Sequence, residues 1–363
     1  MKSFDVAIVS VVPSPYQRDI FRALAARNEI ALQVYYLEKS APDSPWPEEP
    51  LQPWEKLLPG FWFAIANARF HVVTKHPSLG RHRFIILNSL TSSLSQYVLR
   101  FRPRQQKILF WAEPLRDQTS LIRAKIQRNL AAPIRNTDGI IAIGSQAETS
   151  YRRQFPSVRR FNIPYHCGLQ PFLDQPARHD SNNGEVVFLF CGQIIMRKGV
   201  DLLVKAFDQL VRKGHRTQLI LTGREAELDE ILRPVSDETR TRISYQGFCD
   251  PKLLPNVFAK ADVFVLPSRY DGWGVVVNQA LGAGLPVICS DAVGAGFDLV
   301  NPGKNGFRVR AGDIADLAQA MEMFLKHRQL VSQYGAASRK LAKEWTPERG
   351  AEKWISALSE LDH

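Results

Sequence analysis

One segment of the sequence joins an acidic side chain to closely spaced glycines. Residues 263–266 are apolar, and the loop 268–274 that follows carries Asp271 among polar and glycine residues. Glycine permits sharp turns that leave backbone N–H groups facing a ligand. The helix expected from about residue 275 points its positive end at the same place, which suits a phosphate. The segment therefore predicts a site for a small polar or phosphorylated ligand, and a structural turn capped by the aspartate is the alternative.

Two basic residues occupy a comparable position earlier in the chain. An apolar run ends at Gly192, and Arg197 and Lys198 follow before Gly199 and a helical pattern. Cations that follow a buried strand are suited to a diphosphate. Solvated basic loops are also common, so this loop supports the prediction only together with the loop around Asp271.

Both loops belong to a regular alternation of apolar runs and helical patterns. The strands expected in the second half of the chain are 186–191, 218–222, 243–246, 263–266 and 286–290. Such alternation is typical of a parallel sheet with helices on both faces. Ligands bind beyond the carboxyl ends of the strands in these sheets. We therefore expect the two loops to face one ligand.

The first half of the chain repeats the alternation. The strands expected there are 4–12, 30–37, 85–87, 107–111 and 139–143. Residues 38–60 are rich in proline and tryptophan and predict a long, functional loop. The alternation stops at 164–185, which is rich in turn formers. The predicted fold is α/β, with two doubly wound Rossmann-like domains that face a cleft. The expected domains are 1–170 and 171–340, with a helical segment 341–363.

The segment 263–296 resembles the signature of retaining glycosyltransferase family four, whose members have the GT-B fold. Asp271 and Gln279 stand where the family has two glutamates, and Trp273 stands where it has phenylalanine. The positions that match the signature directly are Pro267, Ser268, Gly272, Gly274, Ala280, Gly284, Pro286 and Val287. Gly192, Lys198 and Gly199 resemble the family's glycine- and lysine-bearing loop. The likeness covers about residues 186–330, whereas the first half matches only in its alternation.

The resemblance implies a role for each matching residue. The second domain would bind a nucleotide-sugar donor, with Asp271 accepting hydrogen bonds from the transferred sugar. Lys198, helped by Arg197, would neutralise the leaving diphosphate, and Gln279 would hold the ribose hydroxyls. The remaining donor-binding positions would be Gly192, Gln193, Phe248 beside the base, Gly272, Trp273 and Gly274. No metal or other cofactor is expected, because these cations and a helix end supply the positive charge.

Three departures from the family pattern concern the donor site. Asp271 is one methylene shorter than glutamate, and Gln279 carries an amide in place of a carboxylate. Gln193 stands where many members have arginine. An amide still donates and accepts, but a charge-assisted hydrogen bond is about twice as strong as a neutral one. The alternative function is therefore a catalytically weak nucleotide-sugar-binding or scaffold protein of the same fold.

The resemblance implies that the first domain binds a glycan or lipid-linked acceptor and that the last helix crosses back to it. Glu113 follows a predicted strand directly and is expected to be an acceptor-side or catalytic-support carboxylate, with helix capping as the alternative. Tyr16, Gln17 and Arg18 follow the first strand, where an acceptor contact and a plain helix start are equally compatible with the pattern. His166 is expected to be structural.

The composition is that of an ordinary globular protein. The 363 residues are 45% hydrophobic and 23% charged, which suggests about two domains. The four cysteines form no CxxC pair, so we expect neither a disulfide nor a metal site. No apolar run approaches the roughly 20 residues that span a bilayer, and the first residues lack the pattern of a signal peptide. A cytoplasmic protein is expected.

The charge is strongly basic and unevenly distributed. The net charge is +11, and residues 100–160 hold thirteen basic residues and four acidic ones. This excess indicates either a solvated face or a surface that lies against an anionic membrane, where each basic residue contributes roughly 1 kcal/mol. Charge alone would also suit nucleic acid, but no recognition motif supports that function.

Overall fold

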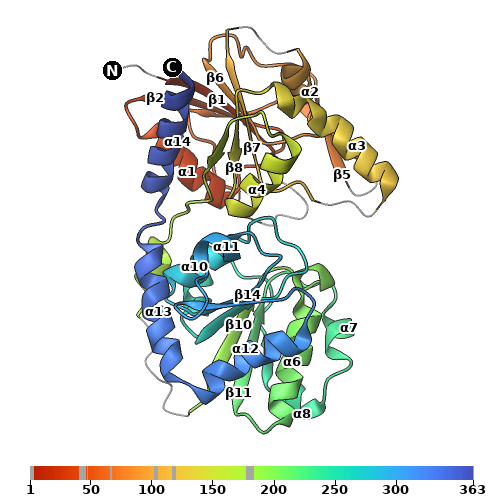
Figure 1. Cartoon of the computed structure of the whole chain (residues 1–363), viewed down its shortest axis with the longest axis vertical. Helices are drawn as coiled ribbons and strands as arrows, with labels where there is room; N and C mark the ends of the chain where they lie inside the picture. Colours follow the sequence, from red (N-terminus) through yellow and green to blue (C-terminus); the bar gives the residue numbers. More distant parts are fainter. Residues whose placement is uncertain are drawn as a thin grey trace. The chain divides into compact units, whose positions relative to one another are not determined.

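The computed structural model describes residues 4–40, 46, 48–65, 68–101, 105–116, 120–176 and 184–362. Parts of the predicted loop 38–60, the basic residues Arg102 and Arg104 and the acidic Asp117 lie outside the described residues. The chain divides into two compact units. The first comprises Met1–Cys167 and Pro347–His363, and the second comprises Gly168–Thr346 (Figure 1).

A seven-stranded parallel sheet forms the centre of the first unit, in the order β3-β2-β1-β6-β7-β8-β9. Its strands are β1 (Phe4–Ser10), β2 (Ile30–Tyr36), β3 (Glu55–Leu57), β6 (Phe84–Leu87), β7 (Lys107–Ala112), β8 (Gly139–Ala142) and β9 (Arg160–Asn162). The helices of this unit are α1 (Pro15–Ala25), α2 (Ser93–Arg100), α3 (Leu121–Ala131), α4 (Ser145–Gln154) and α14 (Pro347–Asp362), with the 3-10 turn η1 (Ala132–Asn136). The central strands are mostly apolar, and β6 and β8 are buried along their whole length, as expected for a sheet covered on both faces.

The prediction of one long loop at 38–60 is wrong. Within this range the structure contains β3, which extends the sheet beside β2, and the first residue of β4 (Gly60–Ile65). β4 pairs antiparallel with β5 (Ala68–Val73) in a separate two-stranded sheet. The pattern of β3 is hidden because it is three residues long and its buried residue is the charged Glu55.

The second unit contains a six-stranded parallel sheet, in the order β12-β11-β10-β13-β14-β15. Its strands are β10 (Val186–Cys191), β11 (Thr217–Thr222), β12 (Ile243–Tyr245), β13 (Val263–Leu266), β14 (Val287–Ser290) and β15 (Gly306–Val309). Its helices are α5 (Gln170–Leu173), α6 (Val200–Arg212), α7 (Leu228–Leu232), α8 (Asp237–Thr241), α9 (Leu254–Phe258), α10 (Val276–Gly282), α11 (Ala295–Leu299), α12 (Ile314–Lys326) and α13 (Gln329–Ala342), with the 3-10 turn η2 (Met196–Lys198). The strand order reverses between β10 and β13, and ligands of such sheets bind at this switch point.

Each of the ten strands expected from the sequence is present, with ends shifted by at most two residues. The predicted α/β class with two parallel-sheet domains is therefore confirmed. Among the described residues, no helix combines the length and the apolar character that crossing a bilayer requires.

The last helix, α14, belongs to the first unit. The indole of Trp354 packs edge-on against that of Trp111 at the end of β7, with ring centroids 5.2 Å apart. Gly350 allows close contact with α1, since a Cβ there would lie 2.7 Å from the Cδ1 atom of Ile20. The segment that follows the second unit in sequence thus completes the core of the first.

Candidate functional site

The acid and the lysine singled out in the sequence form an ion pair at the switch point. Lys198 ends η2, just after β10, and Asp271 lies in the loop after β13. The Lys198 Nζ atom donates a hydrogen bond to Asp271 Oδ2 over 2.6 Å, and the two side chains are 17% and 13% exposed. The predicted meeting of the two loops is therefore observed, although 73 residues separate them.

Glycine at position 199 is what brings the two loops together. Gly199 has a φ of +73°, and a Cβ there would lie 2.0 Å from the carbonyl oxygen of Pro267. Any side chain would push η2 away from the end of β13. Because Lys198 precedes this residue, the close approach fixes the position of the ammonium group relative to Asp271.

Arg269 is a positioning residue that sequence reasoning missed. Its guanidinium pairs with both carboxylate oxygens of Asp201, at 2.6 and 2.8 Å, and also donates to the carbonyl of Met196. Its backbone N–H donates to the carbonyl of Arg197 over 2.8 Å, and Arg197 Nη1 donates to the carbonyl of Tyr270. The only feature of the sequence that could have indicated this role is the position of a charged residue between Ser268 and Asp271.

A segment after β14 supports the loop that carries Asp271. The N–H of Asp271 donates to the carbonyl of Ala292 over 2.9 Å, and the N–H of Gly294 donates to the carbonyl of Asp271 over 3.1 Å. A Cβ at Gly294 would lie 2.2 Å from the carbonyl oxygen of Gly272. No role for this support was predicted from the sequence.

The side chain of Trp273 has a structural environment. It is 1% exposed, its Nε1–H donates to Asn278 Oδ1 over 2.9 Å, and its ring stacks against that of Trp345. Of this residue, only the backbone is placed to contact a ligand. Gly274 beside it has a φ of +87°, the left-handed conformation that favours glycine.

The ends of the strands beside β10 come together through glycines. The N–H of Gly192 donates to the carbonyl of Thr222, and the N–H of Gly223 donates to that of Gly247. A Cβ at Gly223 would lie 1.8 Å from the carbonyl oxygen of Gly192. Phe248 follows directly and is 49% exposed, so its ring is available for stacking on a flat group.

Two amides complete the predicted donor positions. Gln279 lies on α10, and its buried Oε1 atom accepts no hydrogen bond from the described residues. A buried acceptor without a donor is costly unless a ligand or water supplies one. Gln193 is half-buried beside Gly192, and its carbonyl accepts from the N–H of Ile195.

Residues 172–341, which include this whole site, match the family described as glycosyl transferases group 1. The second unit matches this family over nearly its whole length. The recognition made from the Asp271 and Lys198 loops is therefore confirmed at the level of this family and of the GT-B fold.

The chain is also similar to a curated relative and to solved structures. The chain is 24% identical over 210 residues to the alpha-D-kanosaminyltransferase of Streptomyces kanamyceticus. The matched region covers 54% of this chain and 53% of the relative. The chain thus spans about half of that relative's length. Sucrose-phosphate synthase from Thermosynechococcus elongatus matches with a TM-score of 0.74 and 21% identity, over 99% of both chains. Anabaena HepE in complex with UDP matches with a TM-score of 0.72 and 16% identity, over 99% and 100%. These structures show a shared fold.

The first unit contains a hollow at the ends of its central strands. The hollow has a volume of about 400 Å³. Its lining includes Asn88, Ser89, Glu113 and Tyr165. Glu113 is half-buried there, and its carbonyl accepts from Tyr151 Oη over 2.8 Å. The residue at the N-cap of α3 is Ser120, so Glu113 does not cap that helix.

Two of the three residues named after the first strand are buried. Arg18 is 2% exposed and pairs with Glu55, so of the two alternatives the structure supports the plain helix start for this residue. Gln17 is 7% exposed and hydrogen bonds to Ser10 and Tyr165. Both side chains hold the start of α1 against the sheet because their polar groups are satisfied inside the unit.

His166 is structural, as expected. Its side chain is 2% exposed, and Nδ1 lies 2.8 Å from the carbonyl oxygen of Pro164. Burial lowers the pKa of His166 to about 4, so the ring is neutral near pH 7.

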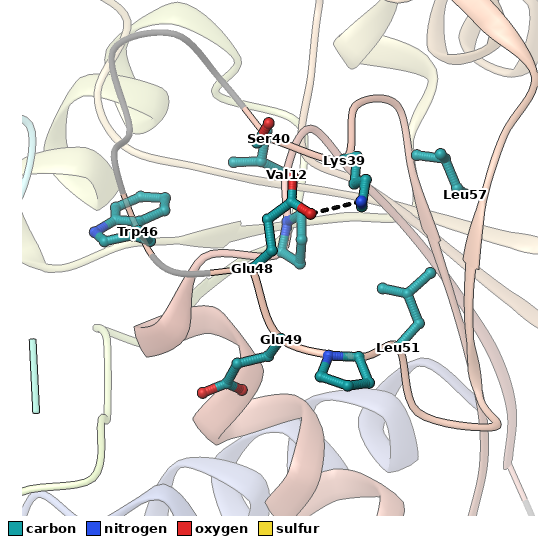
Figure 2. A pocket seen from close by; sticks show the side chains of 10 residues that line it. Val12, Lys39, Ser40, Trp46, Glu48, Glu49, Leu51 and Leu57 are labelled. Carbon is teal, nitrogen blue, oxygen red and sulfur yellow. Dashed lines mark ion pairs between the residues drawn. The ribbon is translucent and has the colours of Figure 1, made fainter.

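A second hollow of about 180 Å³ lies beside the first strand of this unit. Figure 2 shows Lys39 and Glu48 pointing toward one another across it, with Nζ and Oε2 2.5 Å apart. Val12, Leu51 and Leu57 supply apolar walls. Because Lys39 and Glu48 neutralise each other, the remaining lining of this hollow is mainly apolar.

Proposed function

We propose that this protein is a retaining glycosyltransferase, which moves a sugar from a nucleotide-sugar donor to a glycan or lipid-linked glycan acceptor. The observation that carries the proposal is the Lys198–Asp271 pair at the switch point of a unit that matches the glycosyl transferases group 1 family. A cation suited to a phosphate, Lys198 Nζ, lies 2.6 Å from Asp271 Oδ2, an acceptor suited to sugar hydroxyls. The likeness to HepE, whose structure was solved in complex with UDP, supports this class of donor.

In the proposed reaction the bond between the sugar C1 atom and the diphosphate oxygen breaks, and its electron pair stays on the diphosphate. Lys198 and Arg197 neutralise this developing charge in place of a metal ion or other cofactor. The acceptor hydroxyl forms the new bond to C1 on the face that the diphosphate leaves, and its proton passes to the leaving phosphate oxygen. Asp271 orients the sugar by accepting hydrogen bonds from its hydroxyls.

The remaining positions complete the proposal. Phe248 stacks beside the base, and Gln279 binds the ribose hydroxyls through its unsatisfied Oε1 atom. The backbone of Gly192, Gln193 and the 272–274 loop supports the phosphates and the sugar. Glu113 lies on the acceptor side, where its hollow offers polar groups to a hydroxyl. We further propose that the protein acts at the inner face of the cytoplasmic membrane.

Binding of a nucleotide sugar is expected to raise the melting temperature. A ligand that binds only the folded state stabilises it by about 2.7 kcal/mol at a concentration of 100 Kd. A thermal-shift panel of UDP-, GDP- and ADP-sugars tests this, and Lys198→Ala is expected to reduce the shift. If no donor in the panel shifts the wild-type protein, the proposed donor site is wrong.

Gln279→Glu is expected to tighten donor binding about tenfold, because a carboxylate forms charge-assisted bonds to the ribose hydroxyls. Isothermal titration with the donor found in the panel measures the change, and Gln279→Ala should bind more weakly than wild type. If Gln279→Glu binds the donor more weakly than wild type, the proposed contact between Gln279 and the ribose hydroxyls is wrong. The scaffold alternative would instead be supported if wild type binds the donor but neither transfers nor hydrolyses it, whereas Gln279→Glu does.

A further inference from the structure

Exposed apolar side chains gather on the two-stranded sheet of the first unit. Phe61, Phe63 and Ile65 on β4 are 58%, 42% and 55% exposed. Alternate residues of a strand point to the same side, so these three share one face of the sheet. The ring of Phe63 stacks on that of Phe70 across the strand pair, which keeps this face apolar on both strands. Exposed apolar clusters of this kind mark interaction sites.

Further exposed apolar side chains lie on two helices of the same unit. α2 packs against β5, and the side chains of Gln96 and Arg100 donate to carbonyls of α3. Figure 1 shows β5, α2 and α3 on one side of the unit. On α3, Leu121, Ile122 and Ile126 are 89%, 73% and 45% exposed. We call these apolar residues, together with the exposed basic residues of α3, the apolar–basic face. The apolar residues are Phe61, Phe63, Ile65, Leu121, Ile122 and Ile126.

The charges on α3 and in the sequence around β4 and β5 are predominantly basic. α3 carries exposed Arg123, Lys125 and Arg128 and no acidic residue. Between Glu55 and Glu113 the sequence has no acidic residue and nine basic ones. Among these, Arg69 pairs with Glu38, Arg83 with Asp362 and Lys107 with Asp138, which leaves an excess of basic residues. The partner of the face must therefore offer both negative charge and an apolar layer.

We infer that the apolar–basic face docks on an anionic lipid bilayer, with Phe61 and Phe63 entering the boundary between headgroups and acyl chains. This names the contact surface for the membrane location proposed above, on which it rests. Interfacial binding of this kind grows with buried apolar area and with attraction between basic residues and anionic lipids. A second copy of the chain fits less well, because a twofold contact would set the basic residues against themselves.

Co-sedimentation of the full chain with vesicles tests the inference. Wild type should bind vesicles of phosphatidylcholine with phosphatidylglycerol, but not pure phosphatidylcholine, and should be released at 0.5 M salt, where roughly 4 Å of screening length remains. Phe61→Ser with Phe63→Ser should weaken binding about tenfold or more. Lys125→Gln with Arg128→Gln should weaken it at low salt by a similar factor.

Matched variants in the second unit serve as controls. Phe297→Ser removes a side chain as exposed as Phe63, at 43% against 42%. Lys205→Gln with Lys304→Gln removes two exposed charges. Both should bind vesicles like wild type. Unchanged binding by the Phe61 and Phe63 variant, no binding by wild type, or a wild-type dimer that this variant converts to monomer would each overturn the inference. The variant with Phe61→Ser and Phe63→Ser should transfer sugar to a water-soluble acceptor as fast as wild type. If wild type binds vesicles but transfers no sugar, the proposed function is wrong and the docking surface stands.

Discussion

Lys198→Ala is expected to lower kcat/KM for sugar transfer by about a hundredfold to a thousandfold. The ammonium group neutralises charge that develops only as the diphosphate leaves, and the removal of one such group typically has this effect. Asp271→Ala should lower kcat/KM similarly, because the sugar then loses its orienting acceptor. Steady-state kinetics with the donor identified by thermal shift measure both.

The double variant and a surface lysine provide the controls. Residues that act as a unit are not additive, so Lys198→Ala with Asp271→Ala should be little worse than either single variant. Lys205→Ala, an exposed lysine on α6 of the same unit, should leave kcat/KM unchanged. A Lys198→Ala enzyme that keeps kcat/KM within threefold of wild type would remove this lysine from the mechanism.

Glu55→Gln is expected to lower the free energy of unfolding of the first unit by about 3–5 kcal/mol. Arg18 Nε and Nη2 donate to the two Glu55 oxygens over 2.9 and 2.5 Å, and the side chains are 2% and 0% exposed. Burial acts to lower the pKa of Arg18, but the hydrogen bond and charge of Glu55 outweigh it and raise the pKa. Without the carboxylate a buried guanidinium loses its main counter-charge. Urea unfolding measures the loss.

Two further variants separate the buried pair from the surface pairs nearby. Arg22→Met removes a pair with Glu49 whose side chains are 43% and 45% exposed, so it should cost less than about 1 kcal/mol. Arg18→Met with Glu55→Met should be more stable than either single substitution, because no unpaired charge stays buried. A cost of less than 1 kcal/mol for Glu55→Gln would show that Glu49 alone satisfies Arg18.

The sequence was sufficient to predict most strands of the two parallel sheets and the meeting of the two site loops. Long apolar runs such as those of β10 and β13 are readable because both faces of these strands are covered. β3 and the β4–β5 pair were missed for the opposite reason. The one buried residue of β3 is an acid paired across the unit, and the apolar residues of β4 face outward. Neither pattern follows the rule that apolar residues mark the core.

The supports of the site were harder to predict than its reacting groups. Asp271 and Lys198 have chemistry that their residue types reveal. The role of Arg269 depends on Asp201, and that of Gly294 depends on a carbonyl 22 positions earlier in the chain, at Gly272. Contacts between segments that lie apart in sequence leave no local pattern. The role of Arg18 stayed open for the same reason, because its partner Glu55 lies 37 residues away.

The placement of α14 has a consequence for how the protein folds during synthesis. The first unit is assembled from Met1–Cys167 and Pro347–His363, and the whole second unit separates these parts. During synthesis, Trp111 cannot contact Trp354 until the whole second unit has been made. The second unit is continuous in sequence, so it can complete its core earlier, since domains generally fold as units. We expect the contact between the two indoles to be among the last steps of maturation.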